Sequence, residues 1–128
     1  MRSEPMINVA DVEASSAWYQ RLLGAKSGHG GSHFEMLLHD DQLMLMLHAA
    51  DAEEHHPHQE ADGPLGKGVV LYFRVGGELP EAVERAKAME AQILQGPLMN
   101  ELAHQEELWV RDPDGYTLVL CGPADWAR

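Results

Sequence analysis

The chain opens with a short alternating segment and continues with a segment of helical period. The branched apolar residues Ile7 and Val9 alternate with Met6 and Asn8, which is typical of a strand with one buried face. The next residues predict a helix that begins after Asp11, a suitable N-cap, and ends at Gly24, a common residue just past a helix. Between these ends, side chains recur at helical spacing at Ala14, Trp18 and Leu22.

The rest of the first half reads as strands followed by a loop. A glycine-rich connection precedes a predicted strand at 34–38, and a turn at Asp40-Asp41 leads into a second strand at 42–48. Residues 49–67, "AADAEEHHPHQEADGPLGK", are rich in Ala, acids, His, Pro and Gly and have no apolar periodicity. They therefore predict a connecting loop.

The second half repeats this order of elements. We expect a strand at 68–75, a helix at 78–94, a break at 95–100 and a hairpin at 107–122. Neither half can close a hydrophobic core alone, so we expect two helix-backed sheets to pair. The predicted second helix has Pro80 in its first turn and an apolar side formed by Ala82, Val83, Ala86, Met89 and Ile93.

Composition narrows the class of protein. With 128 residues and 45% hydrophobic content, the chain has the size of one domain. Its net charge of −12 argues against nucleic acid and anionic membranes as partners and favours a neutral or cationic small molecule. Cys121 is the single cysteine, so no internal disulfide can form, and the N-terminal residues do not resemble a signal peptide or a membrane span. These features predict a cytoplasmic protein.

Two segments resemble the landmarks of a known superfamily. The segments "VADVEASSAWYQRLLG" at 9–24 and "RDPDGYTLVL" at 111–120 are similar to those of the vicinal oxygen chelate superfamily. That superfamily includes glyoxalase I, bleomycin-resistance proteins, fosfomycin-resistance enzymes and extradiol dioxygenases. The resemblance covers nearly the whole chain. It does not imply one reaction, since this fold hosts several chemistries as well as non-catalytic binders.

The resemblance implies an α+β fold of two βαβββ modules. They form a curled mixed sheet, or half-barrel, around a cavity, usually in a homodimer. On this basis residues 1–128 form a single domain, with module one at 1–50, a connecting loop at 51–67 and module two at 68–128.

The resemblance also implies four metal-ligand positions, which this chain does not fill with ligands. They fall on Glu4, Met46 (with Met44 as the nearest alternative), Val70 and Val119. Only Glu4 is a good ligand for the divalent metals that the superfamily uses, because a thioether is too soft and an isopropyl group has no donor. A catalytic metal needs about three protein ligands. We therefore expect no metal and no cofactor at these positions.

Strand alternation predicts the cavity wall. Rows of Leu, Ile and Val should pack under the helices, and the opposite rows should face the cavity. Thioethers, aromatic rings and a few polar groups suit a partly apolar ligand, although a packed interior would show the same Met residues. The expected ligand-binding residues are Asn8, Met44, Met46, His48, Tyr72, Arg74, Trp109 and Thr117, with Cys121 beside them.

The sequence is compatible with three functions. The leading one is a metal-independent small-molecule binder of the drug-sequestering type. The alternative is a metal-dependent lyase, isomerase or dioxygenase with a divalent metal at a displaced site, because His and carboxylate groups are suitable ligands. The third is an interaction module whose cavity is packed shut. The displaced site would draw on His48, His55, His56, His58, His104 or Glu106.

Overall fold

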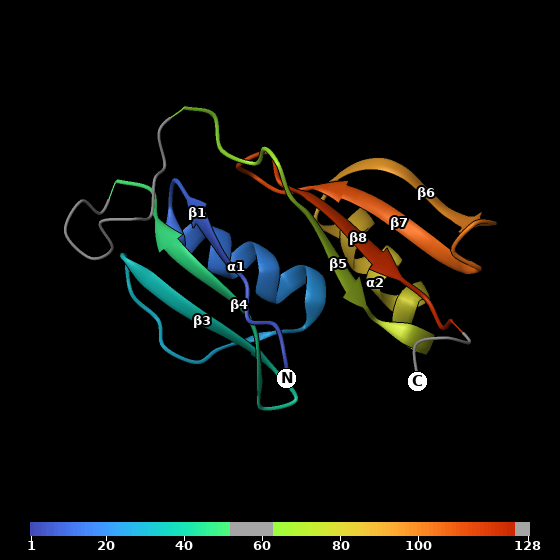
Figure 1. The fold of residues 1–128 in the computed structure, drawn as a ribbon, viewed down its shortest axis with the longest axis horizontal. Coiled ribbons are helices and arrows are strands. Elements are labelled where there is room, and N and C mark those ends of the chain that lie inside the picture. Colours follow the sequence, from blue (N-terminus) through green and yellow to red (C-terminus); the bar gives the residue numbers. More distant parts are fainter. Residues whose placement is uncertain (52–62, 125–128) are drawn as a thin grey trace. The chain divides into compact units, whose positions relative to one another are not determined.

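The structure is a computed structural model that describes residues 1–51 and 63–124 (Figure 1). The chain forms two compact units, residues 1–65 and 66–128, and the division falls within the predicted loop. Each unit contains one mixed four-stranded sheet with an α-helix on one face (Figure 1). The order of elements is therefore strand, helix and three strands in both units, as the superfamily resemblance implies. The residue pattern alone predicted only the last two strands after each helix.

The first unit has the sheet order β1-β4-β3-β2, with β1 parallel to β4 and the other pairs antiparallel. The side chain of Asp11 caps the helix by accepting the Ala14 amide at 3.0 Å, and Gly24 ends it in the left-handed conformation at φ 69°. The elements are β1 (Met6–Val9), α1 (Val12–Leu23), β2 (Lys26–Ser27), β3 (Phe34–His39) and β4 (Gln42–Ala49).

The buried side of α1 differs from the predicted stripe. Leu22 is fully buried as expected, but Ala14 is exposed and Trp18 is only partly buried. The predicted stripe followed the i, i+4 line through Trp18, whereas Tyr19 next to it is the aromatic residue that enters the core. The buried residues of the helix are Val12, Ser15, Ser16, Tyr19, Leu22 and Leu23.

The second unit has the sheet order β5-β8-β7-β6, with β5 parallel to β8. Leu108, Val110, Leu118 and Leu120 are fully buried, as predicted, on the same side of the sheet as α2. The elements are β5 (Val70–Arg74), a 3₁₀ turn (Gly76–Glu78), α2 (Leu79–Ala88), β6 (Gln92–Asn100), β7 (Gln105–Arg111) and β8 (Thr117–Cys121).

The prediction for residues 78–100 was wrong in two places. The helix ends at Ala88, so Ile93 belongs to β6, and the segment predicted as a break is itself part of that strand. Glu90 has a φ of 53°, which cannot continue a helix. Pro97 is compatible with β6 because this strand is at the sheet edge and its pairing with β7 is irregular on either side of Gln95.

The Asp-Pro-Asp-Gly segment forms the β7–β8 turn. The buried carboxylate of Asp112 accepts the amides of Asp114 at 2.9 Å and Tyr116 at 2.8 Å, and Gly115 has a φ of 96°. The turn therefore sets the register in which Arg111 pairs with Thr117. None of the helices in the described residues is long and apolar enough to cross a membrane.

Candidate ligand-binding faces

The sheet of the second unit carries a polar and aromatic row on the face opposite α2, called here its open face. Tyr72, Val119 and Trp109 are register partners across β5, β8 and β7. One step along the strands, Arg74, Cys121 and Glu107 form the next row. Because alternate residues share a face of a strand, both rows lie on the open face.

Glu107 is the buried anion of this face. The residue is 2% exposed, and its carboxylate accepts three side-chain hydrogen bonds. The donors are Gln105 Nε2 at 2.7 Å, Trp109 Nε1 at 3.0 Å and Asn100 Nδ2 at 3.1 Å. The bond from Nε1 orients the indole of Trp109, since this is the only hydrogen-bond donor of the ring.

Glu107, Cys121 and Tyr72 on the open face have pKa values that are shifted away from neutral pH. Burial would raise the pKa of Glu107, but the three side-chain donors and the nearby charge of Arg74 outweigh it and lower that pKa. Burial raises the pKa of the Cys121 thiol, which Arg74 lowers and Glu107 raises further. Partial burial and the charges of Glu107 and Cys121 raise the pKa of Tyr72. No member of this cluster is thereby tuned toward pH 7 as a general acid or base.

Tyr72 and Trp109 form an aromatic pair above Val119. Their ring centroids are 6.3 Å apart with an interplanar angle of 77°, an edge-to-face arrangement. Tyr72 is 54% exposed, and Trp109 is partly buried. The pair therefore offers an accessible aromatic surface whose indole is held by Glu107.

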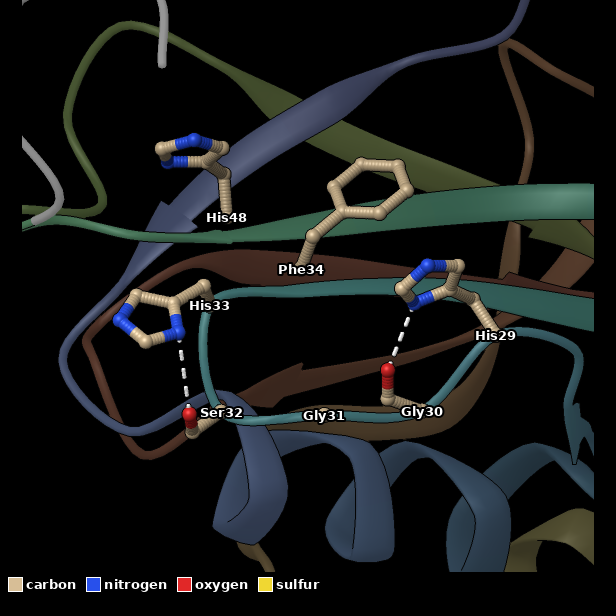
Figure 2. Close-up of a pocket in the computed structure, with 7 residues that line it drawn as sticks. All are labelled: His29, Gly30, Gly31, Ser32, His33, Phe34 and His48. Carbon is tan, nitrogen blue, oxygen red and sulfur yellow. Dashed lines mark hydrogen bonds between the residues drawn. The ribbon is translucent and has the colours of Figure 1, made fainter. Parts of the chain in front are cut away.

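The open face of the first unit, opposite α1, carries imidazole and apolar side chains. Asn8, His48 and Phe34 are register partners across β1, β4 and β3, and Met6, Met46 and Met36 form the next row. A pocket of about 690 Å³ lies at the end of this face (Figure 2). The residues lining it are His29, Gly30, Gly31, Ser32, His33, Phe34 and His48.

Three histidines surround this pocket in different environments. His48 is 3% exposed, although a position at a strand end favours exposure, and its Nδ1 lies 2.9 Å from the Ala49 carbonyl. His29 Nδ1 lies 2.6 Å from the Gly30 carbonyl. A carbonyl only accepts, so both rings carry their proton on Nδ1 when neutral. Figure 2 shows the rings of His48, Phe34 and His29 on the side away from the helix, while His33 turns toward Ser32.

A buried carboxylate holds the glycine-rich connection that forms one wall of the pocket. Glu35 accepts the hydroxyls of Ser16 and Ser27, both at 2.8 Å, and the amides of His29 at 3.2 Å and Gly30 at 2.9 Å. Burial would raise the pKa of Glu35, but these hydrogen bonds outweigh it and lower it. Glu35 thus links α1 to the connection and positions the loop structurally.

The predicted ligand-binding residues divide between the two open faces. Asn8, Met46 and His48 fall on the open face of the first unit, with Met44 beside a register shift in the β3–β4 pair. Tyr72, Arg74, Trp109 and Thr117 fall on the open face of the second unit.

Sequence reasoning missed Glu107 as part of this face. The alternation that assigned Trp109 and Arg111 to the open side of β7 also assigns Glu107 and Gln105 to it. The signal was therefore in the sequence, because Glu107 is the first residue of the predicted hairpin, but the open row was read only from Trp109 onward.

The superfamily's metal positions do not fit a metal ion. Glu4 is exposed, lies before β1 and pairs with Arg2 at 2.9 Å. Val70 is 46% exposed, whereas Val119 is fully buried in the centre of its sheet. Neither valine has a donor atom, and the sulfur of Met46 is a poor ligand for a hard cation.

The histidine alternative receives no support from the described residues. His55, His56 and His58 lie outside them, and His104 is exposed in a turn. Glu106 lines a hollow on the α2 side of its sheet, opposite to Glu107. Within residues 1–51 and 63–124, no three His, Cys, Asp or Glu side chains are placed so that they could hold a metal ion.

Repeated βαβββ units with mixed four-stranded sheets define the vicinal oxygen chelate fold. The model of the Glyoxalase/Bleomycin resistance protein/Dioxygenase superfamily matches residues 3–120, and the chain belongs to this superfamily. No curated protein matches the sequence.

Solved structures show the same fold at low sequence identity. A glyoxalase/bleomycin resistance protein/dioxygenase family enzyme from Burkholderia phytofirmans is 22% identical with a TM-score of 0.76, over 94% of this chain and 96% of that one. A lactoylglutathione lyase from Agrobacterium tumefaciens is 18% identical with a TM-score of 0.74, over 100% and 97%. A protein of unknown function from Agrobacterium tumefaciens is 20% identical with a TM-score of 0.77, over 97% and 95%.

Proposed function

We propose that this protein is a small-molecule binder of the drug-sequestering type, which holds its ligand without a metal and without a chemical step. The observation that carries the proposal is the Tyr72–Trp109 pair, which is accessible and anchored by a buried carboxylate. An exposed aromatic pair on a polar sheet face suits a planar, partly apolar ligand. We include the homodimer that the family implies as a further prediction.

The protonation states of the open face favour binding over catalysis. A general acid or base works best with a pKa near the operating pH. The pKa of Glu107 is lowered and those of Tyr72 and Cys121 are raised, so each shift moves the group away from neutrality. Cys121 is also 1% exposed, which keeps its thiol from acting as a nucleophile.

The chemistry of the donor set supports a metal-independent role. Of the four positions at which the superfamily holds a metal, two are valines and one is a methionine. These side chains cannot hold a metal ion that would bind the oxygen atoms of a substrate. The charge of −12 favours the approach of a neutral or cationic ligand.

A ligand panel with two matched variants tests the proposal. Thermal-shift measurements with planar cationic, neutral and anionic compounds should yield a stabilising ligand. Tyr72→Ala should weaken its binding by about tenfold, because one aromatic contact is lost. Trp18→Ala is the control, since Trp18 is also partly buried and edge-to-face with a tyrosine, at 4.9 Å, but belongs to α1. Equal affinity in wild type and Tyr72→Ala would contradict the proposal.

A further inference from the structure

The second unit contains a basic pocket at the start of β5. This pocket, of about 360 Å³, is lined by residues from the segment before β5, from β7 and from the β7–β8 turn. Its polar members are Lys67, Arg111 and Thr117, and three glycines bring backbone close to it: Gly66, Gly68 and Gly115. Two cations meet here in a chain with 9 Lys and Arg against 21 Asp and Glu.

A close approach of two glycines builds the pocket. Gly66 has a φ of 83°, and a Cβ placed on it would lie 2.5 Å from the carbonyl carbon of Gly115 and 2.8 Å from the Tyr116 nitrogen. Only a residue without a side chain allows this packing of backbone on backbone. The contact fixes the segment that carries Lys67 against the turn that follows Arg111.

The two cations have no acidic partner in the part of the chain that the structure describes. Neither Lys67 nor Arg111 makes an ion pair there, and the Nε of Arg111 is buried without a hydrogen-bond partner. The adjacent carboxylate of Asp112 accepts backbone amides of the turn instead. A buried unpaired N–H of a guanidinium costs free energy, so such a group is normally satisfied by a partner.

The neighbouring side chains suit an anion rather than another cation. Thr117 is the register partner of both Arg111 and Val70, which places a hydroxyl donor beside the guanidinium. A guanidinium fork, an ammonium group and a hydroxyl together match the oxygens of a carboxylate or phosphate group.

We propose that this pocket binds an oxyanion, the phosphate or carboxylate group of a small molecule, between Lys67, Arg111 and Thr117. The oxyanion accepts hydrogen bonds from the two cationic side chains that line the pocket and neutralises their positive charges. The site is one row away from the Tyr72–Trp109 pair along the same strands and involves neither ring. It goes beyond the function proposed above, because it requires neither the aromatic ligand nor its binding.

Phosphate and acetate titrations followed by NMR test the site. At constant ionic strength, inorganic phosphate should shift the amide resonances of Gly66 and Gly68 and the Nε–H resonance of Arg111 in a saturable manner. Acetate, titrated separately, shows whether a carboxylate suffices. Lys67→Gln should weaken the phosphate response by about tenfold, since one charge-assisted hydrogen bond is lost. Lys67 is exposed before β5, so this variant should retain the fold.

A second lysine variant serves as the control for the phosphate titration. Lys26→Gln, in β2, makes the same change of net charge at an exposed lysine outside the pocket and should leave the phosphate response unchanged. A linear, non-saturating response, or equal affinity in wild type and Lys67→Gln, would overturn the proposal. The Tyr72→Ala variant should bind phosphate normally, which separates failure of this site from failure of the aromatic one.

Discussion

At the scale of single residues, Val119 and Glu107 determine the chemistry of the open face of the second unit. Val119 is a hydrocarbon at a superfamily metal position and is fully buried. Glu107, one register step from it on β7, carries the negative charge of this face. Its ionised form is stabilised by three neutral donors and by Arg74, so the charge is held for structure and orientation.

Glu107→Gln should destabilise the protein at neutral pH by about 1–3 kcal/mol, because the new amide presents N–H groups to donors and leaves a buried bond unmade. The neighbouring Glu106→Gln is the control, since Glu106 is exposed and lies on the opposite face. Its stability should change by less than about 0.5 kcal/mol. Urea unfolding monitored by circular dichroism measures both.

The difference in the free energy of unfolding between wild type and Glu107→Gln should depend on pH. Because the folded-state pKa of Glu107 lies below the ordinary value of 4.5, its stabilisation is present above that value and is lost as pH falls through the folded pKa. The gap should therefore be widest at neutral pH and narrow in acid. A gap that stays constant down to pH 3 would show that Glu107 does not titrate in this way.

At the scale of elements, the turn and the segment before β5 act together. The Asp-Pro-Asp-Gly turn fixes the β7–β8 register, and Gly66 packs directly on Gly115 of that turn. The basic pocket therefore depends on a backbone contact with the same turn that sets the β7–β8 register. The corresponding support in the first unit is Glu35, which joins α1 to the glycine-rich connection.

Gly66→Ala should destabilise the protein much more than Gly68→Ala. Both glycines have a positive φ, 83° and 81°, so each substitution costs about 1–2 kcal/mol for the backbone conformation. Only Gly66 has backbone within 3 Å of the new Cβ, whereas Gly68 has open space. The clash should bring the total for Gly66→Ala to about 2–5 kcal/mol. Equal melting temperatures of the two variants would refute the close approach.

At the scale of the whole molecule, two βαβββ units repeat one plan with different chemistry. Each sheet packs its Leu and Val rows under one helix, and the opposite row faces away from that helix. The first unit places imidazole rings and methionines there, and the second places aromatic rings, a carboxylate and cations. The superfamily's fold is thus present, while three of the four positions that the resemblance assigns to metal ligands carry no suitable donor.

Chelators should leave the melting temperature unchanged, and added divalent ions should not raise it, because three of the four superfamily positions offer no suitable ligand. Thermal unfolding with and without EDTA, together with elemental analysis of purified protein, measures this. Stoichiometric metal that disappears in His48→Ala would instead support the displaced histidine site.

The sequence by itself determined the first strand of each unit, the start of each helix, both caps of α1, the closing hairpins and the Leu rows, because these depend on local chemistry and on alternation. Tertiary structure decided the rest. Residues 92–100 form a strand because they pair with β7 at the edge of the sheet. Local propensity predicted the first of these residues as the end of a helix and the others as a break. The donors around Glu107 and the contact of Gly66 with Gly115 join residues that only strand pairing and the packing of the turn bring together. No local pattern encodes such contacts, so the candidate sites emerged only with the fold.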